Sequence, residues 1–179
     1  MREDIEKILF SSEELQEKVS ALGRDITRDY AGKFPICVGV LKGSFVFMAD
    51  LMRCIDLPCQ IEFMAVSSYG NRSETTGAVE IKKDLSTDIE GRHVIVIEDI
   101  LDSGLTLSYL IQYLENRSPA SVEICTLLDK PVRRKAPVNP RYLGFQIPDH
   151  FVVGYGLDFA ERYRNLPYIG VLKKEIYQP

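Results

Sequence analysis

Residues 93–110, HVIVIEDILDSGLTLSYL, constrain the fold more than any other stretch of the chain. They begin with the run 93–97, which is apolar, rich in β-branched residues and too short for a helix, as is typical of a buried parallel strand. Apolar residues then recur at helical spacing from Leu107 to Leu114. The stretch therefore predicts a strand, an acidic loop and a helix N-terminus, and open α/β sheets bind ligands at such strand ends.

The loop between this strand and this helix carries groups suited to a phosphorylated sugar. A helix N-terminus offers free N–H groups and a partial positive charge to a phosphate. Gly104 allows the backbone to approach an anion, and Ser103 and Thr106 add hydroxyl groups. Glu98 and Asp99 are acceptors suited to sugar hydroxyls or to hydrated Mg²⁺. An ordinary βα turn with an N-cap explains any one of these residues, but it explains the whole set poorly.

Composition narrows the class of protein. A chain of 179 residues, 45% of them hydrophobic, predicts one domain over residues 1–179 with a real core. The net charge of −4 argues against a general nucleic-acid binder. No apolar stretch approaches membrane-spanning length, and the N-terminal residues lack the apolar region of a signal peptide. The four cysteines form no CxxC pair, so we expect reduced thiols in a cytoplasmic protein. Together, these features predict no nucleic-acid or membrane partner.

Strands and helices alternate along most of the chain, which predicts an α/β fold: a parallel β-sheet flanked by helices on both faces. The C-terminal segment is expected to add a small hood. The expected strands are 36–41, 60–66, 79–81, 93–97, 122–128, a short one within 142–153, and 169–176. The expected helices are 12–30 with a capping box at Ser11 and Glu14, one through Phe45 and Met52, one through Leu107 and Leu114, and a short one before Pro167.

Several segments admit two interpretations. Lys42 and Gly43 follow a strand and can bind phosphate, or they are a solvated lysine and a glycine turn. The polar residues 67–78 form either a functional loop or the tip of a hairpin. Residues 131–140 are a basic connector whose run 133–135 predicts a solvated face or a subunit contact. Phe151 can stack on a purine or pack in the core.

Two of these motifs resemble those of a known family. The run 94–107, VIVIEDILDSGLTL, resembles the phosphoribosyl-pyrophosphate (PRPP) loop of the type I phosphoribosyltransferases. Glu-Asp followed by Asp-Ser-Gly is similar to the hypoxanthine-guanine branch. The run 41–44, LKGS, resembles the pyrophosphate-binding loop of the same family. The resemblance extends from Leu41 to Arg164, and it favours ligand-binding interpretations for Lys42, the loop 67–78 and Phe151.

The resemblance implies transfer of 5-phosphoribose from PRPP to a 6-oxopurine by a Mg²⁺-dependent homo-oligomer, a dimer or a tetramer. Asp102 is the implied catalytic base, which takes a proton from the purine. The implied ligand-binding residues are Asp102, Ser103, Gly104, Leu105 and Thr106 for the 5′-phosphate, Glu98 and Asp99 for ribose or Mg²⁺, Lys42, Gly43 and Arg164 for pyrophosphate, Lys130, Phe151 and Val152 for the base, and Asp158 for a second metal or the purine.

Three alternatives stay open on the sequence alone. The base can be xanthine or a broader range of 6-oxopurines, because backbone groups would read the C2 position. The chain can be a regulator that senses PRPP without catalysis, although such a protein has no need of Lys130 or Asp102. Finally, Asp102 can be no more than a helix N-cap.

Overall fold

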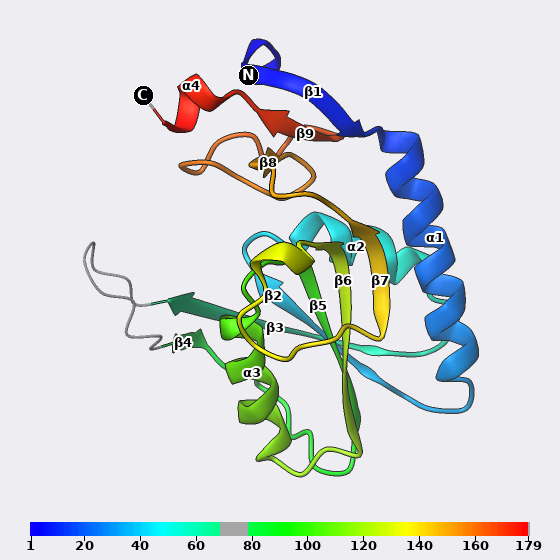
Figure 1. Ribbon diagram of the computed structural model, residues 1–179. Coiled ribbons are helices and arrows are strands. Elements are labelled where there is room, and N and C mark those ends of the chain that lie inside the picture. Colours follow the sequence, from blue (N-terminus) through cyan, green and yellow to red (C-terminus); the bar gives the residue numbers. More distant parts are fainter. Residues whose placement is uncertain (69–78, 179) are drawn as a thin grey trace.

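The computed structural model describes residues 1–68 and 79–178 (Figure 1). Its strands are β1 (Ile5–Phe10), β2 (Ile36–Leu41), β3 (Gln60–Ser68), β4 (Val79–Lys83), β5 (His93–Leu101), β6 (Ser121–Asp129), β7 (Tyr142–Gln146), β8 (Val152–Val153) and β9 (Ile169–Leu172). Its helices are α1 (Ser12–Asp29), α2 (Phe45–Cys54), α3 (Leu105–Glu115) and α4 (Lys174–Tyr177), with short 3₁₀ turns at Arg2–Asp4 and Pro131–Arg133.

Six strands form the main sheet in the order β4-β3-β2-β5-β6-β7. All neighbouring pairs are parallel except β3 and β4, which pair antiparallel at one edge. The chain builds outward from β2 on one side and from β5 on the other, so the strand order reverses between these two central strands. In sheets of this kind a ligand binds at the carboxyl ends of the strands where the order reverses. The predicted α/β class, a largely parallel sheet with helices on both faces, is confirmed.

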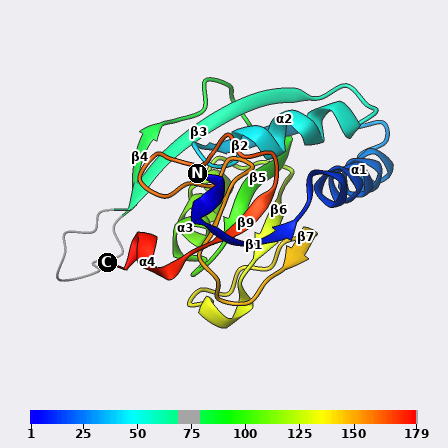
Figure 2. The ribbon, with the colours of Figure 1, turned by 90° about the horizontal axis from the view of Figure 1, so that it is seen from above.

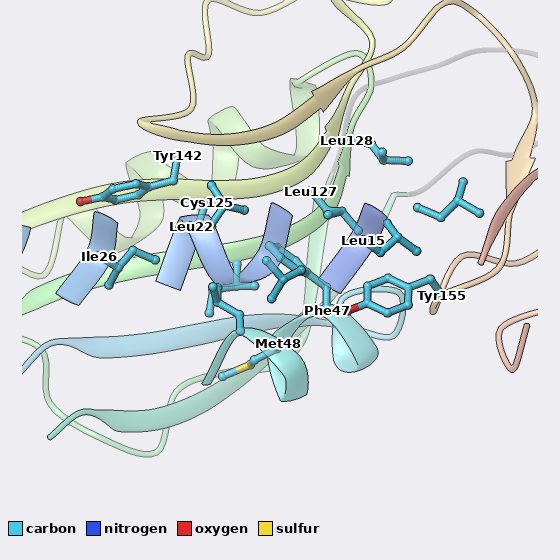
Figure 3. Packing of buried hydrophobic residues seen from close by; sticks show 14 of the residues in the cluster. Leu15, Leu22, Ile26, Phe47, Met48, Cys125, Leu127, Leu128, Tyr142 and Tyr155 are labelled. Atoms are coloured by element: carbon cyan, nitrogen blue, oxygen red, sulfur yellow. The ribbon is translucent and has the colours of Figure 1, made fainter. Parts of the chain in front are cut away.

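Side-chain alternation along the central strands decides which helix covers which face. On β5, Ile95 and Ile97 pack with α1 and α2, whereas Val94 and Val96 pack with α3. Burial of each such side chain contributes roughly 1.5–3 kcal/mol, so the alternation fixes helices on both faces. Figure 3 shows the first of these layers, with Leu15, Leu22 and Ile26 of α1, Phe47 and Met48 of α2, and Cys125 and Leu127 of β6.

The start of α1 is confirmed in atomic detail. The backbone N–H of Glu14 donates to Ser11 Oγ over 3.2 Å, and the N–H of Ser11 donates to the Glu14 carboxylate over 2.8 Å. This reciprocal pair is the capping box that the sequence predicted, and it satisfies two donors that the first helical turn leaves free.

A second, three-stranded antiparallel sheet has the order β1-β9-β8. Together with the loop 154–168 it forms the hood, and Figure 2 shows β1 and β9 lying side by side across the top of the main sheet. The prediction that the hood comes from the C-terminal segment was incomplete, since β1 supplies one of its strands. No local pattern predicted β1, because this edge strand lacks a clean polar–apolar alternation and its partner β9 lies far along the chain.

Two local predictions near the C-terminus were wrong. Residues 159–166 form turns instead of a helix, and Ala160, Glu161 and Tyr163 have positive φ angles, which a helix does not allow. The last strand ends at Leu172, after which α4 begins, so strand 169–176 was too long. In addition, β3 continues through Ser68, two residues into the predicted loop 67–78, and the rest of that loop lies outside the described residues.

The described helices and cysteines carry two further observations. Within residues 1–68 and 79–178, no helix has the length and hydrophobicity that crossing a bilayer requires. All four cysteines are free thiols, as predicted. Burial raises the pKa of Cys37 to about 12, so this thiol stays protonated and packs as a small apolar group.

Candidate active site

The central strand is longer than the sequence indicated. β5 runs to Leu101 and stays paired with β6 at Glu98, Ile100 and Leu101, so Glu98 and Asp99 lie on a strand and not in a loop. The predicted strand 93–97 was therefore too short. Its acidic residues resemble a loop sequence, but the parallel ladder of β6 extends beside them and supplies backbone hydrogen bonds.

A cavity of about 250 Å³ opens where β2 and β5 end. Because these strands flank the point where the strand order reverses, the cavity lies where a sheet of this kind binds its ligand. Its wall brings together most of the residues singled out after β2 and β5. The lining residues are Val40, Leu41, Gly43, Val66, Glu98, Asp99, Ile100, Leu101, Asp102, Ser103, Gly104, Thr106 and Leu107.

The N-terminus of α3 faces this cavity with unused N–H groups. Its N-cap is Gly104, whose φ of +78° suits glycine, and within the described residues no side chain caps it. The Ser103 hydroxyl lies 3.4 Å from the Leu105 N–H, at the outer range of a hydrogen bond. The alternative that Asp102 serves as the N-cap is therefore wrong. The free N–H groups and the helix dipole together favour an anion such as a phosphate.

Glu98 and Asp99 form an acidic pair on the same wall, in which Asp99 is buried and Glu98 is half-buried. Burial and then the charge of Asp99 raise the pKa of Glu98 well above its usual range. Burial likewise raises the pKa of Asp99 to about 6, although the Ile100 N–H, which donates to its carboxylate over 2.9 Å, opposes this change. One oxygen of Glu98, Oε2, is buried without a hydrogen bond among the described residues. A free carboxylate oxygen beside a second carboxylate indicates a place for a cation or for hydroxyl groups.

The pair fits a magnesium ion only in part. Within the described residues, no group of three or more His, Cys, Asp or Glu side chains could enclose a metal. Magnesium keeps several waters, however, and commonly binds through one or two carboxylates plus substrate phosphates. The donor set therefore suits an ion that is held by Glu98 and Asp99 on one side and by substrate oxygens on the other.

The acidic pair predicts an unusual dependence of stability on pH. Because the folded pKa of Asp99 is raised from 3.8 to about 6, the folded protein gains stability from this group below about pH 4 and loses that stability as the pH rises through 6. At pH 8 without metal, the free energy of unfolding of Asp99→Asn should therefore exceed that of the wild type by on the order of 2–3 kcal/mol, and the variant should unfold at a higher temperature. Thermal melts in EDTA at pH 8 and pH 5 check this, and a variant that is equally destabilised at both pH values would contradict it.

Gly43 lies directly against the acidic pair. A β-carbon at position 43 would overlap with the Asp99 carboxylate, so only glycine allows the loop after β2 to approach β5 this closely. The peptide bond between Leu41 and Lys42 is cis. The loop after β2 and the end of β5 thus form one continuous wall, as the sequence predicted for two parallel strand ends.

Four charged residues meet between the loop after β2 and the hood. Lys42 Nζ lies 3.1 Å from Glu161 Oε1, and Arg164 Nη2 lies 2.9 Å from Asp158 Oδ1 and 3.5 Å from Glu161 Oε1. Arg164 also donates to the Gly156 carbonyl over 2.7 Å. The predicted residues Lys42, Asp158 and Arg164 are therefore brought together, and Glu161 joins them without having been predicted.

The connector after β6 also takes part in the site. Lys130 is buried at the end of β6, and its Nζ lies 3.7 Å from Asp149 Oδ1. Arg133 Nε lies 2.8 Å from Asp102 Oδ1, without the alignment of a hydrogen bond, and Arg133 Nη1 donates to Asp149 over 3.3 Å. A series of ion pairs thus connects Asp102 to Lys130 through Arg133 and Asp149. Asp102 and Lys130 are the two residues that were expected to contact the purine.

The basic run 133–135 was predicted as a solvated face or a subunit contact, and a solvated face is wrong for Arg134, whose side chain is only 18% exposed. Arg134 pairs with the buried Asp129 and donates to the carbonyl groups of Asp102 and Val138. Together with Arg133 it fixes the connector against the loop after β5. The sequence held one signal for a role of this connector in the site, namely that it directly follows the strand end at Lys130. No such signal marked Asp149 or Glu161.

Phe151 and Val152 lie in the hood. The Phe151 ring stacks on Tyr177, with centroids 4.6 Å apart, and contacts Phe159 edge-on. Val152 is buried in β8 and pairs with Val171 of β9. Tyr177 thus covers one face of the Phe151 ring, and this aromatic cluster supports the hood.

Comparison with known proteins agrees with this geometry. The family model described as the phosphoribosyl transferase domain matches residues 8–160. The hypoxanthine-guanine phosphoribosyltransferase of Bacillus subtilis is 56% identical over 99% of both chains, and that of Staphylococcus aureus is 52% identical over 99% of both. A crystal structure of the hypoxanthine phosphoribosyltransferase from Staphylococcus aureus, 51% identical, covers 100% of this chain and 97% of its own with a TM-score of 0.97. The chain therefore belongs to the phosphoribosyltransferase family, in the hypoxanthine-guanine branch that its sequence motifs resemble.

Proposed function

We propose that this chain transfers the 5-phosphoribosyl group of PRPP to hypoxanthine or guanine, which gives IMP or GMP and pyrophosphate. One observation carries the proposal: three unlike groups meet at adjacent strand ends, namely the N-terminus of α3, the acidic pair Glu98 and Asp99, and the buried Lys130. The helix N-terminus suits a phosphate, the acidic pair suits ribose hydroxyls or a metal ion, and Lys130 suits an oxygen of a purine. The similarity of the whole chain to the relatives named above supports the same reaction.

We assign the sugar phosphate to the loop before α3. The backbone N–H groups of residues 102–106, including that of Leu105, hold the 5′-phosphate, and the hydroxyls of Ser103 and Thr106 donate to it. Glu98 and Asp99 accept hydrogen bonds from the ribose hydroxyls or from water on Mg²⁺. When bound, Mg²⁺ neutralises charge on the leaving pyrophosphate. Lys42, Gly43 and Arg164 face that group, which concentrates the positive charge of the site where negative charge develops.

We assign the purine to the space between the connector after β6 and the hood. Lys130 donates to O6, which selects hypoxanthine and guanine over adenine, whose amino group offers no acceptor there. Phe151 stacks on the base, and the backbone of Val152 contacts its edge. Asp158 contacts a second metal or the purine. Asp102 accepts the proton from N7 as the glycosidic bond forms, so it acts as the general base.

Lys130→Ala tests the assignment of the base. It should weaken the binding of guanine by about 1–3 kcal/mol, because a purine acceptor would be left without its donor, and it should spare PRPP affinity. Calorimetric titrations of guanine and of PRPP separate the two effects. Lys135→Ala is the matched control, since it removes an exposed lysine from the same connector. If the Lys130 variant loses PRPP binding as much as guanine binding, the assignment is wrong.

Two rival functions and several further properties complete the proposal. Xanthine, or a broader range of 6-oxopurines, is the rival substrate, and a PRPP sensor without catalysis is the rival of another class. The buried Lys130, with its ion-pair partner Asp149, favours a base-binding enzyme over a sensor.

We also propose that the chain is one domain, works in the cytoplasm as a homo-oligomer, and requires no nucleic acid or membrane.

A further inference from the structure

We propose that Glu161 takes the place of pyrophosphate in the free enzyme. Its carboxylate pairs with Lys42 and Arg164, the cations that bind the diphosphate, and the substrate must displace it from them. This inference rests on the proposed function, which assigns Lys42 and Arg164 to pyrophosphate. It adds a residue that weakens the binding of PRPP and speeds the departure of the product.

The contacts of one oxygen atom carry the inference. Glu161 Oε1 lies 3.1 Å from Lys42 Nζ and 3.5 Å from Arg164 Nη2. Lys42 comes from the loop after β2 and Arg164 from the hood, and a single carboxylate oxygen bridges them. An oxygen of a diphosphate has the same charge and the same preference for paired cationic donors. The hydrogen bond and charge of Lys42 lower the pKa of Glu161, so the bridging group is a carboxylate at neutral pH.

The backbone of the hood aims Glu161 at these cations. Its N–H donates to Asp158 Oδ2 over 2.9 Å, and its φ of +61° turns the chain back on itself. Asp158 Oδ1 pairs with Arg164 over 2.9 Å. Asp158 therefore holds Arg164 in place with one oxygen and orients Glu161 with the other. The turn that replaces the predicted helix at residues 159–166 is what presents the Glu161 side chain to Lys42.

Exposure shows which carboxylate can leave. The side chains of Lys42 and Glu161 are 68% and 65% exposed, whereas those of Arg164 and Asp158 are 20% and 28% exposed. Exposed ion pairs are weak because water competes for both partners. Glu161 can therefore rotate into solvent while Asp158 keeps its contact with Arg164. Arg164 Nε is buried without a hydrogen bond among the described residues.

The charges of the cluster make displacement necessary. Lys42 and Arg164 balance Asp158 and Glu161, so the free site is neutral overall. A diphosphate adds negative charge at the position that the Glu161 carboxylate occupies, and like charges repel each other at such short distances. PRPP binding and pyrophosphate binding must therefore each compete with Glu161.

Glu161→Gln tests the inference by a gain of affinity. It should tighten pyrophosphate binding about two- to fivefold, the range expected for an exposed ion pair, and lower the KM for PRPP by a similar factor. Isothermal titration with magnesium pyrophosphate gives the first value and steady-state kinetics the second. Glu161→Asp, which keeps the charge but shortens the reach, should also gain affinity. Glu17→Gln removes an equal charge from an exposed position of α1 and should change neither value.

Lys42→Met separates this inference from the proposed function. If Lys42 binds pyrophosphate, that variant loses affinity whatever Glu161 does. A loss in Lys42→Met with unchanged or weaker binding in Glu161→Gln overturns the proposed role of Glu161 alone. Unchanged binding in both variants overturns the assignment of Lys42 to pyrophosphate as well.

Discussion

Asp102→Asn should lower kcat with guanine by roughly 10²–10⁴, the usual loss when a general base is removed. The substitution keeps the shape of the side chain and removes its ability to accept a proton. The KM for PRPP should change far less, because the free N–H groups at the N-terminus of α3 survive the change. Since Gly104 is the N-cap of that helix, a loss of capping cannot account for a fall in rate. Steady-state kinetics together with a thermal melt measure both quantities.

Arg133→Gln is the matched control for this prediction. Arg133 Nε lies 2.8 Å from the Asp102 carboxylate, so Asp102 could matter only because it holds Arg133 against the loop. Arg133→Gln breaks the same ion pair and leaves the carboxylate intact. If Arg133→Gln reduces kcat as much as Asp102→Asn does, or if Asp102→Asn keeps a near-normal kcat, the base must be sought elsewhere.

Removal of divalent metal should abolish activity completely. An excess of EDTA should leave no PRPP-dependent product, and Mg²⁺ or Mn²⁺ should restore it, because Glu98 and Asp99 add negative charge beside a leaving pyrophosphate and a divalent cation would offset the charge of both. Full activity in EDTA would contradict the metal assignment of Glu98 and Asp99.

Binding measurements can locate the metal independently of activity. Without substrate, Mg²⁺ should raise the melting temperature of the wild type at pH 8, because it relieves the repulsion between two buried carboxylates. The same stabilisation should shrink in Glu98→Gln and persist in Glu17→Gln, whose residue lies on the exposed face of α1. Equal stabilisation of all three proteins would place the ion somewhere else.

The sequence predicted the main sheet well because its strands are strongly apolar and buried. β2, β5 and β6 each carry runs of β-branched or aliphatic residues whose alternation fixes both covering helices. It failed in the hood. There β1 has no readable pattern, and the positive φ angles of Ala160 and Glu161 depend on packing between distant segments that no local spacing reveals.

The candidate site divides in the same way. Its predicted members lie at or near strand ends, where the fold itself brings Lys42, Glu98 and Lys130 to one edge of the sheet. The residues that were missed, Arg133, Asp149 and Glu161, reach the site from irregular segments. Their positions depend on hydrogen bonds and ion pairs outside the strands, such as the bond from Glu161 N–H to Asp158. Local sequence carries little of that information.

One measurement tests the central claim most directly. Purified enzyme with Mg²⁺ and PRPP is incubated separately with hypoxanthine, guanine, xanthine, adenine and uracil, and the nucleotide and pyrophosphate formed are both quantified. Hypoxanthine and guanine should give equal amounts of nucleotide and pyrophosphate, and adenine and uracil should give none, because Lys130 requires an acceptor at O6 of a purine. Nucleotide formed from adenine or uracil, or no PRPP-dependent product with any base, would contradict the proposed function.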